Sequence, residues 1–123
     1  MKPVAAIACL GLAAAVLAGC GPNPPPRRLA FGDVGQGKII AGREACGSCH
    51  LISGMQQWDG LVGPPLDAFG RRTVIAGVLP NTTDNLTRWL KSPQAVVPGN
   101  AMPDTRLTDQ QARDLAAFLE SLQ

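Results

Sequence analysis

Apolar residues recur at helical spacing most clearly near the end of the chain. The segment 108–111 (TDQQ) is a capping box, in which a threonine hydroxyl and a glutamine side chain three residues later satisfy each other's backbone N–H groups. The apolar positions after it lie three and four residues apart and so share one helix face: Ala112, Leu115, Ala116, Leu119 and Leu122, with Phe118 beside them. The pattern predicts a last helix that begins at Thr108.

A weaker helical pattern covers residues 33–45. Asp33 is a suitable N-cap, and we expect Ile39 and Ile40 to face the core. The glycines in this segment lower its helix propensity, which indicates that they serve a close approach to another element.

A third helix is predicted at residues 83–92, with Leu86, Trp89 and Leu90 on one face and Pro93 as its end. Residues 51–81 and the stretch from Pro98 to Pro103 are rich in glycine and proline and are predicted to be loops. Because no segment alternates in the manner of a strand, the predicted fold class is all-α.

The first segment has the features of an export signal. Lys2 precedes an uncharged apolar run, residues 4–18, that is too short for a comfortable membrane span of roughly 20 residues. Residues 17–20 (LAGC) resemble the lipobox of bacterial lipoproteins, which implies cleavage before Cys20 and a lipid on its thiol. An ordinary signal that contains a cysteine and an uncleaved anchor helix are the alternatives.

The predicted organisation therefore has three parts: a signal peptide at 1–19, a lipidated Cys20 with a proline-rich tether at 20–32, and one folded domain at 33–123. Four prolines within residues 21–30 favour extended chain, which at about 3.1 Å per residue reaches roughly 30 Å. We expect an exported protein on the periplasmic or cell-surface side, anchored to a membrane.

The segment 46–50 (CGSCH) is the attachment motif of haem c. On a helical turn, residues three and four apart share a face, so Cys46 and Cys49 can bind one edge of the porphyrin while His50 reaches its iron. A zinc site would need more ligands, since His50 is the only histidine. A redox disulfide of the thioredoxin type would need strands between the helices.

A second axial ligand cannot be histidine from this chain, so methionine, another donor or an open position remains. Met55 lies too near His50 to reach the opposite face of the ring. Met102 lies in a proline-flanked loop between two predicted helices, which favours a rigidly placed ligand over a methionine that merely fills the core. The expected metal ligands are therefore His50 and Met102.

The order of these motifs, CGSCH, then Gly63-Pro64, then Met102-Pro103 before a last helix, resembles that of class I cytochromes c over about residues 33–122. Within that family the sequence is most similar to the cytochrome c domain fused to subunit II of bacterial haem-copper oxidases. The residues that carry this likeness are Gly70-Arg71-Arg72, Leu79-Pro80-Asn81, Leu86, Trp89, Pro93, Pro98-Gly99-Asn100 and Met102-Pro103. The resemblance implies a small cytochrome c fold, with three to four helices and long loops around one covalent haem.

The same resemblance implies roles for individual residues. Pro64 marks the place where a neighbouring backbone carbonyl receives the proton of the axial imidazole, and Arg71 and Trp89 correspond to donors to a haem propionate. Gly37 corresponds to the glycine where the first and last helices cross, and Phe118 packs near it. The sequence departs from the family where an aromatic residue is usual, since Ile40 and Ala41 stand there, so we expect a smaller helix contact.

A haem with two protein ligands leaves no open substrate position, so the expected function is one-electron transfer and the chain is not expected to be an enzyme. The resemblance implies a bacterial respiratory chain, with a quinol-oxidising complex or a cytochrome as donor and a terminal oxidase as acceptor. The alternatives are a fixed haem subunit of a dehydrogenase or oxidase complex and a gas-binding sensor. Without Lys2 the chain has 10 basic and 9 acidic residues, and with a charge this close to balance we expect no nucleic-acid partner. The expected oligomeric state is a monomer.

Overall fold

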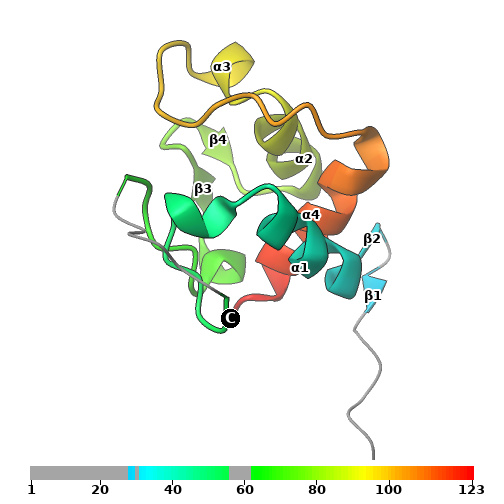
Figure 1. Ribbon diagram of the computed structural model, residues 1–123. Helices are drawn as coiled ribbons and strands as arrows, with labels where there is room; N and C mark the ends of the chain where they lie inside the picture. Colours follow the sequence, from blue (N-terminus) through cyan, green and yellow to red (C-terminus); the bar gives the residue numbers. More distant parts are fainter. Residues whose placement is uncertain (1–27, 30, 56–61) are drawn as a thin grey trace, which may run out of the picture.

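The computed structural model describes residues 28–29, 31–55 and 62–123 (Figure 1). Their helices are α1 (Val34–Arg43), α2 (Thr83–Lys91), α3 (Pro93–Val96) and α4 (Asp109–Ser121), with 3-10 turns η1 (Cys46–Ser48) and η2 (Phe69–Arg71). The prediction of a small, mostly helical domain is confirmed. The signal peptide, Cys20, and residues 21–27 and 30 of the tether lie outside the described residues.

Two short antiparallel strand pairs accompany the helices. Strand β1 (Arg28–Leu29) pairs with β2 (Gly32–Asp33), with Arg28 opposite Asp33, and β3 (Val74–Ile75) pairs with β4 (Leu79–Pro80), with Ile75 opposite Leu79. The sequence analysis predicted neither pair. Each strand has two residues, which is too short for the alternation that marks a strand in a sequence.

Helix α1 begins as expected, because the Asp33 carboxylate accepts hydrogen bonds from the backbone N–H groups of Gly35 and Gln36 at 2.9 and 3.1 Å. Ile40 is buried, but the expectation that Ile39 also faces the core is wrong, since Ile39 is 62% exposed. Neighbouring residues on a helix point about 100° apart, and the buried side of α1 is set by Gly37, Ile40 and Ala41.

Helix α4 contacts both α1 and α2 (Figure 1). Its capping box is present, with Gln111 N–H donating to Thr108 Oγ1 at 3.3 Å and Thr108 N–H donating to Gln111 Oε1 at 2.9 Å. The predicted apolar stripe is buried except for Leu122, which is partly buried. The C-terminal helix therefore forms the centre of the core.

A buried carboxylate also joins α4 to the start of α1. Asp114 Oδ1 accepts hydrogen bonds from the backbone N–H of Asp33 at 2.9 Å and from Gln110 Nε2 at 2.8 Å. A buried polar group is stable when it is paired in this way.

Helix α2 is capped by Thr82, whose hydroxyl accepts from Asn85 N–H at 3.3 Å. Leu86 and Leu90 are buried against α4, and Trp89 is half-buried on the same core. Pro93 ends α2 as predicted but also begins the one-turn helix α3, which the sequence analysis did not predict. Within the described part of the chain, no helix is both long enough and apolar enough to cross a membrane.

Candidate functional site

The CGSCH segment forms a tight turn directly after α1. Ala45, in the left-handed region with φ 53°, separates α1 from η1. Cys49 N–H and His50 N–H both donate to the carbonyl of Cys46, at 3.3 and 3.0 Å. The second bond spans four residues as in an α-helix, so Cys46 and His50 share a face of the turn.

The His50 imidazole is held by the loop at residues 63–64. Its Nδ1 lies 2.7 Å from the carbonyl oxygen of Pro64, so Nδ1 carries the proton and donates it, and Nε2 is the nitrogen left with a lone pair for a metal. The resemblance placed this acceptor beside Pro64, and in the structure it is the carbonyl of Pro64 itself.

Gly63 provides the room for the imidazole. A Cβ on Gly63 would lie 2.2 Å from Cε1 of His50, so the ring would have to move to accommodate any side chain there. The loop is held in place by two backbone hydrogen bonds of 2.8 Å, from Gly63 N–H to Cys49 O and from Leu66 N–H to Leu51 O. The segments on either side of the histidine therefore fix its ring.

Two adjacent arginines have different surroundings. Arg72 Nη2 donates to the carbonyl of Pro65, and its guanidinium lies over the ring of Phe69 at 5.3 Å. Arg71 is exposed, and its side chain makes no hydrogen bond or ion pair with the described residues. The structure thus ties Arg72, which the sequence analysis did not select, to the loop beside His50, while the role of Arg71 at a propionate stays a prediction.

Met102 lies in the segment between α3 and α4 and is partly buried. Its backbone N–H donates to Asn100 Oδ1 at 2.7 Å, and its carbonyl accepts from Gln94 Nε2 at 2.8 Å. Its side chain packs on the same hydrophobic core as Cys46 and Trp89. Three residues from distant parts of the sequence therefore share one core.

The electrostatic setting of Cys46 favours a neutral thiol. Burial, and secondarily the negative charge of Glu44, raise the pKa of the Cys46 thiol to about 11. Cys46 and Cys49 are both thiols rather than a disulfide. Among the described residues no group of three or more histidine, cysteine or carboxylate side chains could hold a metal ion on its own.

These donors fit the expected haem c. Two thiols and an imidazole come from one turn, Nε2 of that imidazole is free, and a thioether comes from a separate loop. Imidazole and thioether are both established axial ligands of haem iron.

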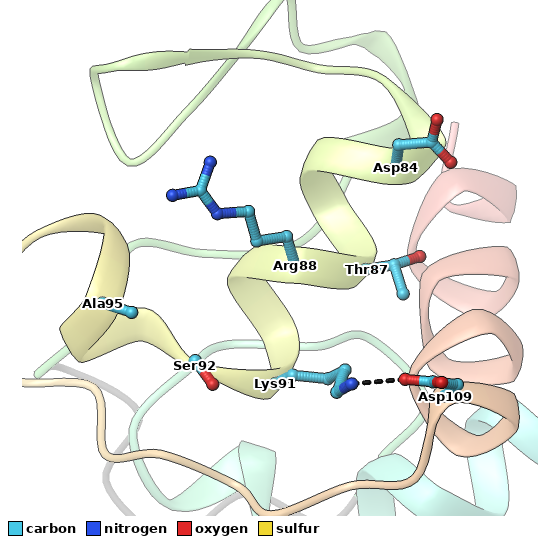
Figure 2. Close-up of a pocket in the computed structure, with 7 residues that line it drawn as sticks. All are labelled: Asp84, Thr87, Arg88, Lys91, Ser92, Ala95 and Asp109. Atoms are coloured by element: carbon cyan, nitrogen blue, oxygen red, sulfur yellow. Dashed lines mark hydrogen bonds and ion pairs between the residues drawn. The ribbon is translucent and has the colours of Figure 1, made fainter.

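A charged cavity lies elsewhere, lined by residues of α2, α3 and the start of α4 (Figure 2). It has a volume of about 450 Å³ and is lined by Asp84, Thr87, Arg88, Lys91, Ser92, Ala95 and Asp109. Lys91 and Asp109 form an ion pair across it, as the dashed line shows. None of the predicted site residues lines this charged cavity, so it is not the place for an apolar ring.

Sequence reasoning missed the residues that hold the site rather than form it. Gln94 and Asn100 fix the backbone of Met102, and Arg72 contacts the loop beside His50. Asn100 carries a usable signal, because an asparagine side chain often bonds to the backbone two residues later. Gln94 carries none, since the bonds that it makes depend on how α3 lies against the loop.

Comparisons with known proteins identify the family of this domain. The family model described as cytochrome c matches residues 34–123. The chain is similar to cytochrome c oxidase subunit 2 of Alkalihalophilus pseudofirmus, with 35% identity over 88 residues that cover 71% of this chain and 25% of the relative. Cytochrome c oxidase subunit 2 of Bacillus subtilis is 33% identical over 91 residues, covering 71% and 26%. The chain thus spans about a quarter of the length of these curated relatives.

Proposed function

Because the chain belongs to the cytochrome c family and its cofactor is therefore covalently bound haem c, we propose that it carries single electrons along a bacterial respiratory chain towards a terminal oxidase. Haem-based electron transfer follows from the family. The respiratory direction is supported by the similarity to oxidase subunit 2.

The observation that carries the proposal is the hydrogen bond between His50 Nδ1 and Pro64 O, 2.7 Å long. When bound, the haem supplies the one-electron change between ferric and ferrous iron. The protein contributes the fixed imidazole, because a donated Nδ1 proton sets the ring orientation and raises the basicity of Nε2. Cys46 and Cys49 form the two thioether bonds in this proposal, and Met102 supplies the sixth ligand.

Other residues complete the proposed site. Trp89 and Arg71 are the donors to a propionate, and Trp89 is half-buried on the same core as Met102. With both axial positions filled by protein, no coordination site is open to a substrate, so the proposed role is that of a carrier and not an enzyme. Keeping both ligands in each oxidation state would also keep structural rearrangement small.

The proposed setting is the outer side of a bacterial membrane, with a lipid on Cys20 as the anchor and residues 21–30 as the spacer. The donor would be a quinol-oxidising complex or another cytochrome, and the acceptor a terminal oxidase. The proposed carrier acts as a monomer and makes brief contacts, which bury less than about 1,200 Å².

A second candidate is a haem subunit that stays fixed within an oxidase complex. It is favoured by one observation: the similar relatives are named as oxidase subunits, and this chain matches about a quarter of their length. Copurification with an oxidase after removal of the lipid would favour the fixed subunit. Release as a single soluble chain would favour the carrier.

The first test is the absorption spectrum of the oxidised and reduced protein, with and without carbon monoxide. We expect a c-type spectrum, the weak far-red band of methionine bound to ferric iron, and no response to carbon monoxide. A missing band together with ready carbon monoxide binding would overturn the proposed ligation and favour a gas-binding sensor.

A further inference from the structure

The side chain of Gln94 uses all of its main hydrogen-bonding groups on the Met102 loop. Its Nε2 donates to the carbonyls of Asn100 at 2.9 Å and Met102 at 2.8 Å, and its Oε1 accepts from the backbone N–H of Gly99 at 3.0 Å. Two acceptors and one donor match the two N–H groups and the carbonyl of an amide. Neither glutamate, which lacks the donors, nor lysine, which lacks the acceptor, could make this set.

Gln94 is itself firmly placed. It lies in α3 next to the buried Pro93, and its backbone N–H donates to the carboxylate of Asp104 at 3.2 Å. Asp104 follows Met102 in the sequence, so α3 holds the loop on both sides of the methionine. The amide of Gln94 therefore projects from a fixed position.

Asn100 completes the arrangement from within the loop. Its Nδ2 donates to the carbonyls of Pro93 at 3.1 Å and Val97 at 2.6 Å, while its Oδ1 accepts from Met102 N–H at 2.7 Å. Both backbone polar groups of Met102 are thus bound by side chains, although the neighbouring Ala101 and Pro103 are exposed.

From this geometry we propose that Gln94 is a positioning residue that keeps the Met102 thioether on the haem iron. The inference rests on the proposed ligation by Met102. Because the peptide groups around Met102 are held by the protein, the loop stays in place when the iron–sulfur bond opens, and the thioether returns quickly. An external ligand then competes poorly for the iron.

The variant Gln94→Ala removes the three bonds and should free the methionine loop. The net value of one hydrogen bond corresponds to about fivefold in an equilibrium, and three are lost, so we expect ferric Gln94→Ala to bind imidazole about tenfold more tightly than the wild type or more. We expect a weaker far-red band and an unchanged amount of covalent haem. Gln94→Glu keeps the size and the acceptor of the side chain but not the donors. It should also raise the imidazole affinity and weaken the far-red band.

The matched control is Thr105→Val. Thr105 Oγ1 donates to Leu90 O at 2.6 Å, so this variant removes a hydrogen bond from the same loop without touching the peptide groups of Met102. We expect a lower unfolding temperature but wild-type imidazole affinity. This comparison separates the positioning of Met102 from a general loss of stability.

The outcomes distinguish the positioning role of Gln94 from ligation of the iron by Met102. If the wild type shows the far-red band and both Gln94 variants keep its imidazole affinity within twofold, the role of Gln94 is refuted while ligation by Met102 stands. If Gln94→Ala does not accumulate, Gln94→Glu decides by the same criterion. If the wild type lacks the band, ligation by Met102 fails and the role of Gln94 fails with it.

Discussion

Gly37 on α1 and Asp114 on α4 meet backbone to backbone. A Cβ on Gly37 would lie 2.0 Å from the carbonyl oxygen of Asp114 and 2.6 Å from the Cβ of Phe118. Only glycine allows the two helices to approach this closely, which agrees with the helix crossing that the resemblance implied at this position.

The first prediction concerns this crossing. Gly37→Ala should destabilise the domain by about 1–3 kcal/mol or more. The new methyl group would overlap the backbone of Asp114, which cannot move aside as a flexible side chain could. Gly42→Ala is the matched control on the same helix. Its Cβ would lie 3.8 Å from Met55 Cε, an ordinary contact, so the gain in helix propensity should stabilise by about 0.5–1 kcal/mol. Urea unfolding measures both, and equal effects would contradict the assignment.

A second prediction concerns Gly63. Gly63→Ala should displace the His50 imidazole, because the new Cβ would overlap its ring. We expect covalent haem with a disturbed proximal ligand, measured as a changed ferric spectrum. Gly70→Ala is the comparison, since its Cβ would meet atoms of Glu120 and Gln123, with Glu120 O at 2.2 Å, and not the histidine ring. It should lower the unfolding temperature and leave the spectrum of the remaining folded protein unchanged.

The two methionines give a third prediction. Met102→Ala should retain covalent haem, lose the far-red band and bind carbon monoxide, because the sixth position is then open. Met55 is also partly buried on the core and serves as the control. Met55→Ala should keep the band and reject carbon monoxide. If the two variants exchanged these behaviours, Met55 would be the ligand. His50→Ala should abolish a normal haem site altogether.

A fourth prediction separates the neighbouring arginines. Arg72→Gln loses the bond to Pro65 and the contact with Phe69, and should cost on the order of 1–2 kcal/mol of stability. Arg71→Gln loses no side-chain hydrogen bond or ion pair with the described residues and should leave the unfolding free energy unchanged. If Arg71 donates to a propionate, its variant should instead shift the reduction potential. A wild-type potential in Arg71→Gln would remove Arg71 from the site.

The ion pair in Figure 2 gives a prediction for pH. The hydrogen bond from Lys91, followed by the charge of Lys91, lowers the pKa of the Asp109 carboxyl. A carboxyl with a lowered pKa in the folded state stabilises above its unfolded pKa of about 3.9 and loses that contribution as pH falls through the folded value. Asp109→Asn should therefore be slightly less stable than the wild type at neutral pH. Because the pair is exposed, the difference should be small, and thermal unfolding should show it vanish in acid.

The helix ends were predictable because their signals are local. Asp33 and Thr108 cap the helices that they were expected to cap, since the bonds involved span two or three residues. Ile39 shows the limit of this reasoning. The buried arc of α1 runs through Gly37, Ile40 and Ala41, and its position depends on where Gly37 meets α4, so Ile39 falls outside it.

The parts that could not be predicted depend on contacts between segments. Helix α3 is a single turn with no apolar pattern, and the β3–β4 pair is equally short. The bonds of Gln94 to the Met102 loop and of Arg72 to Pro65 exist only once the loops are folded. The residues of the motif were visible in the sequence, whereas those that hold them required the structure.

The bond from Asp33 N–H to Asp114 joins residues 81 positions apart and has a consequence for biosynthesis. The cysteine motif follows α1 directly, yet the surface on which α1 rests belongs to the last helix of the domain. A nascent chain that has emerged as far as residue 108 displays both thiols next to a helix whose main packing partner, α4, is still missing. We therefore expect the packed surroundings of the attachment site to form only after the final helix has been synthesised, however early its cysteines leave the ribosome.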